Sequence, residues 1–173
     1  VVGGDVMSPH WTHFLLQSGF TGKLINAYGP TECSVVATAY HVTAIDDVAA
    51  VVPIGRPIAN TEVYVLGEHG ERLAVGVPGE LYIGGDGVGR GYLHRPELTS
   101  ARFVRNPFST DPDARLYRTG DLVQWLPDGL LRFLGRVDNQ VKVRGFRVEL
   151  GEISAALMKN ERVRDAVTVV REE

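Results

Sequence analysis

Residues 26–32 carry the densest group of chemically useful side chains in this sequence and read NAYGPTE. The Gly-Pro pair predicts a shaped turn, because glycine leaves φ free and proline fixes it. On such a turn the ring of Tyr28 can stack on a base, the hydroxyl of Thr31 can reach a phosphate, and the carboxylate of Glu32 can hold a hard cation. These groups suit a nucleotide–magnesium site, although an ordinary loop around a buried tyrosine explains the same residues equally well.

The composition is that of an ordinary globular protein and excludes several classes of function. The 173 residues are 44% hydrophobic and 23% charged, which leaves room for one domain, or one domain and part of another. Eighteen basic and 21 acidic side chains give a formal charge of −3, which indicates neither a nucleic-acid partner nor a membrane surface. No apolar run reaches the length of a membrane span, and the single Cys33 permits no internal disulfide. A reducing, cytoplasmic location is therefore expected.

The first 42 residues have the pattern of an α/β unit. Residues 1–5 are typical of the exit of a buried strand, and a helix is predicted from Ser8 and its following proline to Gly19. A short strand at 23–26 would deliver the NAYGPTE turn, and the apolar run 35–42 predicts another buried strand. Loops at the strand ends of such units are where open α/β sheets bind ligands.

The middle of the chain, residues 43–134, predicts a compact, barrel-like β subdomain. Short β-rich pieces divided by Gly, Pro and Asp turns lie at 62–66, 79–83, 122–126 and 130–134. The Pro-Asp-Gly sequence at 127–129 predicts a hairpin, and 96–104 predicts the one helix of this region.

The last segment predicts the start of a second, small domain. An antiparallel pair, a helix and a strand are indicated at 140–144 with 146–148, 151–158 and 166–171. This ββαβ pattern places a domain boundary near Asp138 and leaves the small domain truncated. The chain starts without methionine, so we expect it to be a piece of a longer protein.

Four stretches, in order, resemble core motifs of the adenylate-forming enzymes, in particular the amino-acid-activating adenylation domains of nonribosomal peptide synthetases. They are 26–32, 79–92 together with 95–99, 117–121 (YRTGD) and 135–148. The resemblance covers about the middle-to-late third of such a domain. It implies a fold of class α/β (α+β in this fragment), with residues 1–137 as the end of the large core and 138–173 as the start of the small C-terminal subdomain. Within the core, 1–42 would be the α/β part and 43–134 the β subdomain.

The family's reaction has two halves, and both are expectations for the parent of this chain. An amino acid carboxylate attacks the α-phosphate of ATP with the help of Mg²⁺, and pyrophosphate leaves. The phosphopantetheine thiol of a partner carrier domain then takes the aminoacyl group. The first half requires alignment of two anions and screening of the charge that develops on phosphorus.

The resemblance implies an adenine site and its residues. They would be Gly4, Asp5, Val6, Asn26, Ala27 and Tyr28. Tyr28 would stack on adenine, with the 4–6 backbone on the other face. Asn26 and the Ala27 backbone would read the edge of the base.

Sugar, phosphate and metal contacts are carried over in the same way. Thr31 would contact the α-phosphate, and Glu32 would ligate Mg²⁺ unless it is merely a solvated surface acid. Asp121 would accept hydrogen bonds from both ribose hydroxyls, although a Gly-Asp pair is by itself more often a turn cap. Phe133 would pack against the sugar, where many relatives have a tyrosine. Arg136 would reach the ribose or phosphate region.

Residues near the predicted boundary would act in the change between half-reactions. Asp138 resembles the family's hinge position, about which the small domain would swing between the two half-reactions. The alternative for Arg136 is a surface ion pair with Asp138. Arg144, Gly145 and Phe146 would face the active site during thiolation, with the glycine leaving space for the pantetheine arm.

The acyl pocket would be lined in part by uncharged residues. They are Val1, Gly3, Ala27, Val35 and Val36. An apolar or aromatic amino acid fits this wall better than a charged one, because an unpaired buried charge is costly.

Three other features of the sequence do not indicate a functional site. The glycine-rich stretch 84–89 does not match the dinucleotide-binding pattern and indicates a strand-end turn. His10 and His13 share a helix face without a third ligand, so a metal site there is not indicated. Cys33 lacks a group that would activate its thiolate and is expected to be a packed core residue.

Parts of the machinery are expected outside these residues. The phosphate-binding loop with its lysine and the acid for the substrate amino group would lie upstream, and the C-terminal catalytic lysine downstream. The isolated chain is therefore expected to be inactive. Two alternatives stay open: an acyl- or aryl-CoA ligase of the same superfamily, disfavoured by the Asn-Gln at 139–140, and a non-catalytic nucleotide-binding or scaffold domain.

Overall fold

The computed structural model describes residues 1–43, 51–138, 140–143 and 146–170. Arg144 and Gly145 of the predicted thiolation face lie outside the described residues, and Phe146 is described only as part of a strand. The chain forms two compact units, Val1–Gly135 and Arg136–Glu173, which we describe separately. In the described part of the chain no helix is long and apolar enough to cross a membrane.

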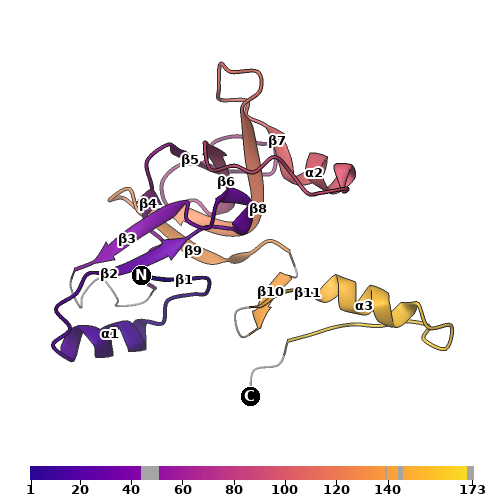
Figure 1. Ribbon diagram of the computed structural model, residues 1–173, viewed down its shortest axis with the longest axis horizontal. Helices are drawn as coiled ribbons and strands as arrows, with labels where there is room; N and C mark the ends of the chain where they lie inside the picture. The colour runs from indigo at the N-terminus through magenta and orange to yellow at the C-terminus, as the bar shows by residue number, and fades with distance from the viewer. Residues whose placement is uncertain (44–50, 139, 144–145, 171–173) are drawn as a thin grey trace. The chain divides into compact units, whose positions relative to one another are not determined.

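The first sheet of the larger unit has four strands. In spatial order they are β1 (Val2–Gly3), β2 (Leu24–Tyr28), β3 (Thr38–Val42) and β4 (Arg56–Pro57). Strand β1 pairs parallel with β2, and the other neighbours are antiparallel. Helix α1 (Pro9–Gln17) connects β1 to β2, which confirms the strand–helix–strand unit (Figure 1).

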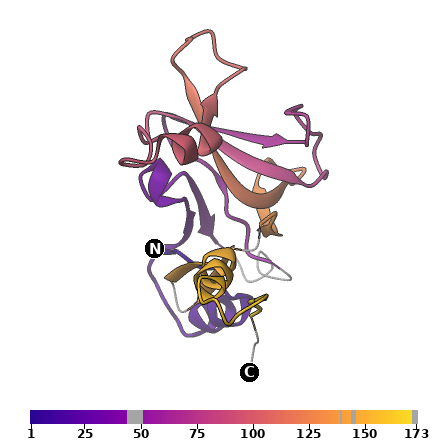
Figure 2. The ribbon, with the colours of Figure 1, turned by 90° about the vertical axis from the view of Figure 1, so that its right-hand side faces the viewer.

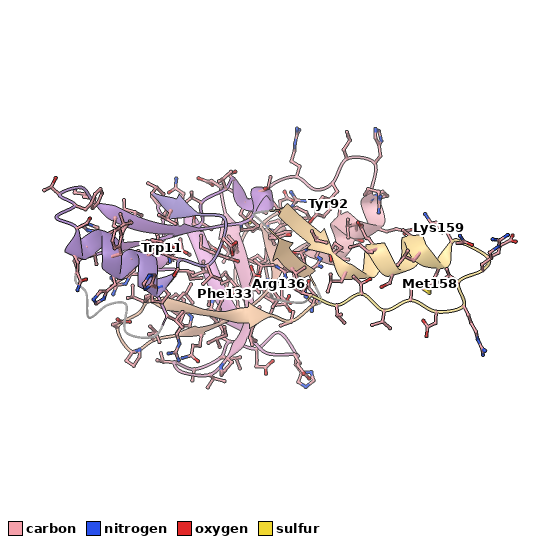
Figure 3. All side chains as sticks on the ribbon, turned by 90° about the horizontal axis from the view of Figure 1, so that it is seen from below. Trp11, Tyr92, Phe133, Arg136, Met158 and Lys159 are labelled. Atoms are coloured by element: carbon pink, nitrogen blue, oxygen red, sulfur yellow. The ribbon has the colours of Figure 1, made fainter. Side chains whose placement is uncertain are left out.

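Local signals set the ends of α1. Ser8 is the N-cap with extended backbone, Pro9 is the first helical residue, and Gly19 follows the helix with φ of 78°. Thr12 is the buried residue of α1, and its hydroxyl donates to the Ser8 carbonyl at 2.8 Å. Trp11, labelled on α1 in Figure 3, is exposed. Helical spacing therefore predicted the helix but not which side chains it buries.

Two predictions for this region need correction. Residues 1–5 do not form a buried strand: β1 has two residues at the edge of the sheet, and Val1 and Val2 are exposed. The predicted strand 35–42 begins only at Thr38, because Ser34 and Val35 have φ of 58° and 74°. These left-handed conformations turn the chain. Ala37, the residue before β3, donates its N–H to the Tyr28 carbonyl at 2.8 Å.

The second sheet is the body of the β subdomain. Its strands are β5 (Thr61–Leu66), β6 (Gly79–Gly85), β8 (Arg115–Trp125) and β7 (Phe103–Arg105) in that order, with β9 (Leu131–Arg136) also on β8. Helix α2 (Pro96–Arg102) precedes β7, and the Leu126–Leu130 hydrogen bond closes the predicted hairpin. The strands of this sheet are seen from another side in Figure 2. The sheet core includes Leu81, Tyr117 and Leu131, each fully buried. Among the described residues the predicted mixed α/β class is confirmed, and the sheets do not close into a barrel.

Gly55 joins the two sheets and is a point where the fold tolerates no side chain. It pairs with Leu131, the first residue of β9, has φ of 93°, and a Cβ there would overlap the Ala39 carbonyl of β3. Gly70 shares the conformation, with φ of 80°, but a Cβ there would meet no atom within 4 Å.

We therefore expect Gly55→Ala to lower the free energy of unfolding by about 1–3 kcal/mol more than Gly70→Ala. Both variants bear the strain of positive φ, about 1–2 kcal/mol, and only Gly55→Ala adds the overlap with backbone. Urea denaturation of the two variants measures the difference. Equal destabilisation would show that the contact with β3 adjusts without cost.

The first elements of the smaller unit are the predicted antiparallel pair of strands and the helix after it. Strands β10 (Gln140–Val143) and β11 (Phe146–Glu149) are antiparallel, and α3 (Leu150–Met158) follows. The predicted strand at 166–171 is wrong over its described residues, 166–170, which have no strand structure. The Thr168 hydroxyl instead lies 2.8 Å from the Ser154 hydroxyl of α3. A strand forms only beside a hydrogen-bonded neighbour strand, and within the described part of the chain β10 and β11 pair with each other alone.

Candidate functional site

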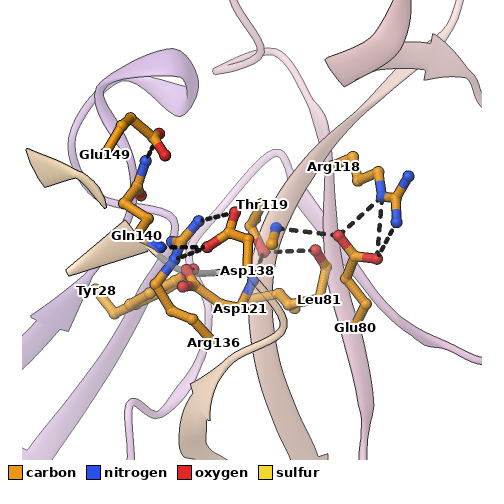
Figure 4. Close-up of polar contacts among 11 residues, drawn as sticks. Tyr28, Glu80, Leu81, Arg118, Thr119, Asp121, Arg136, Asp138, Gln140 and Glu149 are labelled. Carbon is orange, nitrogen blue, oxygen red and sulfur yellow. Dashed lines mark hydrogen bonds and ion pairs between the residues drawn. The ribbon is translucent and has the colours of Figure 1, made fainter. Parts of the chain in front are cut away.

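Tyr28 and Asp121, far apart in the sequence, meet in the larger unit. Tyr28 ends β2 and Asp121 lies within β8, so both stand on strands and not on loops. The Tyr28 hydroxyl donates to Asp121 Oδ2 (Figure 4). The aspartate is 8% exposed. The structure thus brings together the two side chains predicted for base and ribose.

A bulge in β8 presents Asp121. Glu80 pairs with Leu122 and Tyr82 with Arg118, so a single β6 residue lies opposite residues 119–121. Gly120 allows this bulge through its φ of 76°. Within the bulge the Thr119 hydroxyl donates to the Leu81 carbonyl at 2.7 Å and accepts from Asp121 N at 2.9 Å.

Glu80 holds the bulge from the neighbouring strand. Its Oε1 accepts from Gly120 N at 3.1 Å, and its two oxygens accept from Arg118 Nε at 2.9 and 3.0 Å (Figure 4). The YRTGD motif is therefore one positioning device for its final carboxylate. Sequence reasoning missed Glu80, because only the strand register places it opposite the bulge.

Glu32 lies on a short 3-10 turn, η1 (Thr31–Cys33), that starts after Pro30 and ends at left-handed Ser34. The Glu32 carboxylate is half-buried, and its Oε1 accepts from the Tyr92 hydroxyl at 2.7 Å. That hydroxyl also lies 3.3 Å from the hydroxyl of Tyr117. Tyr92 is the last residue of the 79–92 stretch, and no feature of the sequence indicated a role for it.

The glycine-rich segment after β6 packs on this turn. Gly89 N donates to the Glu32 carbonyl at 2.8 Å, and the Ser34 hydroxyl donates to the Gly87 carbonyl at 2.9 Å. A Cβ on Gly89 would stand only 3.1 Å from the Glu32 carbonyl oxygen. The glycines thus allow close approach of one backbone to another.

Burial changes the titration of two side chains at this turn. Burial, with a smaller contribution from the Glu32 charge, raises the pKa of the Cys33 thiol to about 12. Cys33 is thus a protonated core residue at neutral pH, as its sequence context predicts. Burial and hydrogen bonds with Tyr117 and Glu32 raise the pKa of Tyr92 well above its ordinary value, so its hydroxyl remains a donor.

The remaining residues predicted for adenine differ in exposure. Gly4, Asp5 and Val6 are exposed, and Asp5 Oδ1 accepts from Val6 N at 2.7 Å. Asn26 is 3% exposed and its Nδ2 donates to the Pro53 carbonyl at 2.7 Å. This bond connects β2 to the segment before β4. Asn26 therefore has a structural role in addition to its predicted contact with the base.

The residues predicted for the acyl pocket lie on and near β1 and β2. Gly3 pairs with Ala27, and a Cβ on Gly3 would stand 2.6 Å from the Ala27 carbonyl oxygen, so no larger residue fits there. Val1 and Val35 are 86% and 66% exposed, and Val36 is half-buried. Their role toward a substrate stays a prediction.

The smaller unit holds the Arg136–Asp138 ion pair that was the alternative expectation for Arg136. Arg136 Nε and Nη2 donate to the two Asp138 oxygens at 2.6 and 2.8 Å (Figure 4). Gln140 N donates to the same carboxylate at 3.2 Å. The hinge role of Asp138 stays a prediction. Phe133, on β9 of the larger unit, is half-buried and packs against its core.

A magnesium ion suits the donor chemistry at Glu32. The described residues contain no group of three or more His, Cys, Asp or Glu side chains that could hold a metal ion. Mg²⁺ usually takes only one or two protein carboxylates and completes its shell with water and substrate phosphates. One half-buried carboxylate next to the exposed Thr31 therefore fits Mg²⁺ that arrives with a nucleotide.

Comparisons with known proteins agree with one another. The model of the family described as AMP-binding enzyme matches residues 1–93. Bacitracin synthase 3 from Bacillus licheniformis is 51% identical over 99% of this chain, and malpibaldin synthetase from Mortierella alpina is 54% identical over 96%. The chain spans only 3% of the length of each of these relatives.

Solved structures give the same result. PA1221, a nonribosomal peptide synthetase protein with adenylation and PCP domains, superposes with a TM-score of 0.88 at 36% identity, over 99% of this chain and 34% of PA1221. The four-domain synthetase AB3403, bound to AMP and glycine, has a TM-score of 0.70 at 44% identity, over 99% of this chain and 12% of AB3403. The chain therefore belongs to the AMP-binding enzyme family, as an adenylation-domain segment of the nonribosomal peptide synthetase type.

Proposed function

We propose that this chain is part of a domain that activates an amino acid as aminoacyl-AMP and passes it to the phosphopantetheine thiol of a carrier domain. The observation that carries the proposal is the Tyr28–Asp121 pair, which joins a ring suited to a base with a carboxylate suited to a ribose. The 51% and 54% identity to the bacitracin and malpibaldin synthetases supports this assignment over a CoA ligase.

In the first half-reaction an oxygen of the amino acid carboxylate attacks the α-phosphorus of ATP. The bond from that phosphorus to the bridging oxygen breaks, and pyrophosphate leaves. Tyr28 would stack on adenine and Asp121 would accept from the ribose hydroxyls, which fixes the α-phosphate in the line of attack. Thr31 would donate to the α-phosphate.

Glu32 would hold Mg²⁺, which when bound screens charge on the phosphates. Arg136 would contribute a further cation toward the ribose or phosphates. Because it is already paired with Asp138, its guanidinium would be held in a defined orientation.

In the second half-reaction the carrier thiolate attacks the carbonyl carbon of the adenylate. The carbon–oxygen bond to AMP breaks, a thioester forms and AMP leaves. Asp138 would be the hinge for the change between the two reactions, and residues 144–146 would face the thiol. We propose a peptidyl carrier domain as the partner, supported by solved relatives that combine adenylation and PCP domains.

For the substrate we propose an apolar or aromatic amino acid. The acyl-pocket residues predicted above carry no charge, so a charged substrate side chain would lack a partner there. The Gly3–Ala27 pairing leaves no room for a larger residue at position 3.

The test is amino-acid-dependent exchange of labelled pyrophosphate into ATP. A domain completed with the flanking sequence of the parent gene should exchange, with apolar or aromatic amino acids preferred. The isolated 173-residue chain should not. Exchange by the isolated chain would contradict the assignment of essential groups to other segments. Release of a CoA thioester by the completed domain would favour the ligase alternative.

A further inference from the structure

We propose that Tyr92 is a positioning residue that holds the Glu32 carboxylate in its metal-binding orientation. This inference rests on the proposed function, in which Glu32 binds the magnesium ion that accompanies ATP. Tyr92 itself would touch neither the metal nor the nucleotide.

The first support is the contact itself. The Tyr92 hydroxyl lies 2.7 Å from Glu32 Oε1 and donates to it. Both residues are half-buried, so this charge-assisted bond is partly shielded from bulk water. A carboxylate oxygen has two acceptor sites, and a bond at one of them fixes how the group faces a cation.

The second support is that Tyr92 is held independently of Glu32. Its backbone N donates to the Thr99 hydroxyl of α2 at 2.9 Å, and that hydroxyl in turn donates to the Arg95 carbonyl at 2.9 Å. The Tyr92 ring packs edge-on against Phe103, with ring centroids 5.4 Å apart. Glu32 is therefore oriented by a side chain whose own position is set elsewhere.

The third support is that the same segment also fixes the Glu32 backbone. Gly89, three residues before Tyr92, donates its N–H to the Glu32 carbonyl at 2.8 Å. Backbone and side chain of one residue are thus held from residues 89–92. Partners that orient a metal-binding carboxylate in this way typically contribute about ten- to a hundredfold in metal affinity.

The test is Tyr92→Phe in the completed adenylation domain, with Mn²⁺ as a spectroscopic substitute for Mg²⁺. Electron paramagnetic resonance of free Mn²⁺ measures metal retention by the enzyme–ATP complex. We expect about tenfold weaker retention for Tyr92→Phe. Tyr64→Phe is the matched control, since the Tyr64 hydroxyl donates to another glutamate, Glu62, at 2.8 Å. It should retain Mn²⁺ as the parent does.

A double variant separates positioning from general damage. If Tyr92 acts through Glu32, Tyr92→Phe should cause no further loss in a Glu32→Gln background. A further loss there, or unchanged retention by Tyr92→Phe while Glu32→Gln weakens it, would overturn the inference and leave the proposed function intact. If Glu32→Gln retains Mn²⁺ normally, the metal role of Glu32 fails as well.

The melting temperature of each variant shows whether the variant is folded. Should Tyr92→Phe not fold, Thr99→Val carries the test, because it removes the acceptor of Tyr92 N–H and keeps the tyrosine hydroxyl. We expect it to weaken Mn²⁺ retention in the same direction. Unchanged retention would count against the inference.

Discussion

Asp121→Ala is expected to lower kcat/KM for ATP by about a hundredfold in a completed adenylation domain. A hydrogen bond to a charged group contributes about 1.5–3 kcal/mol, and each 1.4 kcal/mol corresponds to a factor of about ten. The proposed role gives Asp121 two such bonds from the ribose. Steady-state exchange kinetics at varied ATP measure the effect, which should lie mainly in KM, because the lost contacts are formed with bound ATP.

Two variants make this result specific. Tyr28→Phe removes the same Tyr28–Asp121 bond but leaves the carboxylate and the ring in place, so it should cost much less than Asp121→Ala. Asp128→Ala removes a carboxylate from the hairpin turn, where Oδ1 accepts a local bond from Leu130 N. It should leave ATP kinetics unchanged. If Tyr28→Phe were as damaging as Asp121→Ala, Asp121 would serve the fold and not the ribose.

Glu32→Gln is expected to lower kcat by about a hundredfold and to raise the Mg²⁺ concentration needed for half-maximal exchange. The substitution keeps an oxygen that can accept from Tyr92 but removes the negative charge that attracts the cation. Loss of one group that stabilises developing charge commonly costs a factor of about a hundred to a thousand. Exchange rates over a Mg²⁺ titration provide the measurement.

The matched control is Glu62→Gln. Glu62 also accepts from a tyrosine hydroxyl, that of Tyr64, and from Asn106 Nδ2 at 3.1 Å, but it lies on β5 and not on the 3-10 turn of Glu32. Its substitution should leave the Mg²⁺ requirement unchanged. An equal shift in both variants would mean that the loss of carboxylate charge anywhere in this unit weakens Mg²⁺ binding. Glu32 would then have no special role.

Much of the fold follows from interactions between near neighbours in the chain, and these could be predicted. Ser8 and Pro9 begin α1, and the Pro-Asp-Gly turn at 127–129 closes a hairpin, because caps and turns depend on the φ angles and donors of a few adjacent residues. Predictions failed where a strand depends on a distant partner. Residues 166–170 have an apolar pattern, but no described strand pairs with them.

The candidate site shows the same difference between what the sequence predicts and what only the tertiary structure decides. Residue types and family resemblance alone picked out Tyr28, Glu32 and Asp121 as nucleotide and metal residues. Only the tertiary structure placed the Tyr28 hydroxyl on Asp121, Tyr92 on Glu32, and Glu80 against the bulge that carries Asp121. The physical reason is that these contacts join segments far apart in the chain. Strand register and the β8 bulge place Tyr28, Glu80 and Asp121, and a one-residue change in register would send a strand side chain to the opposite face. The Tyr92–Glu32 contact depends instead on how the loop of residues 89–92 packs on the 3-10 turn.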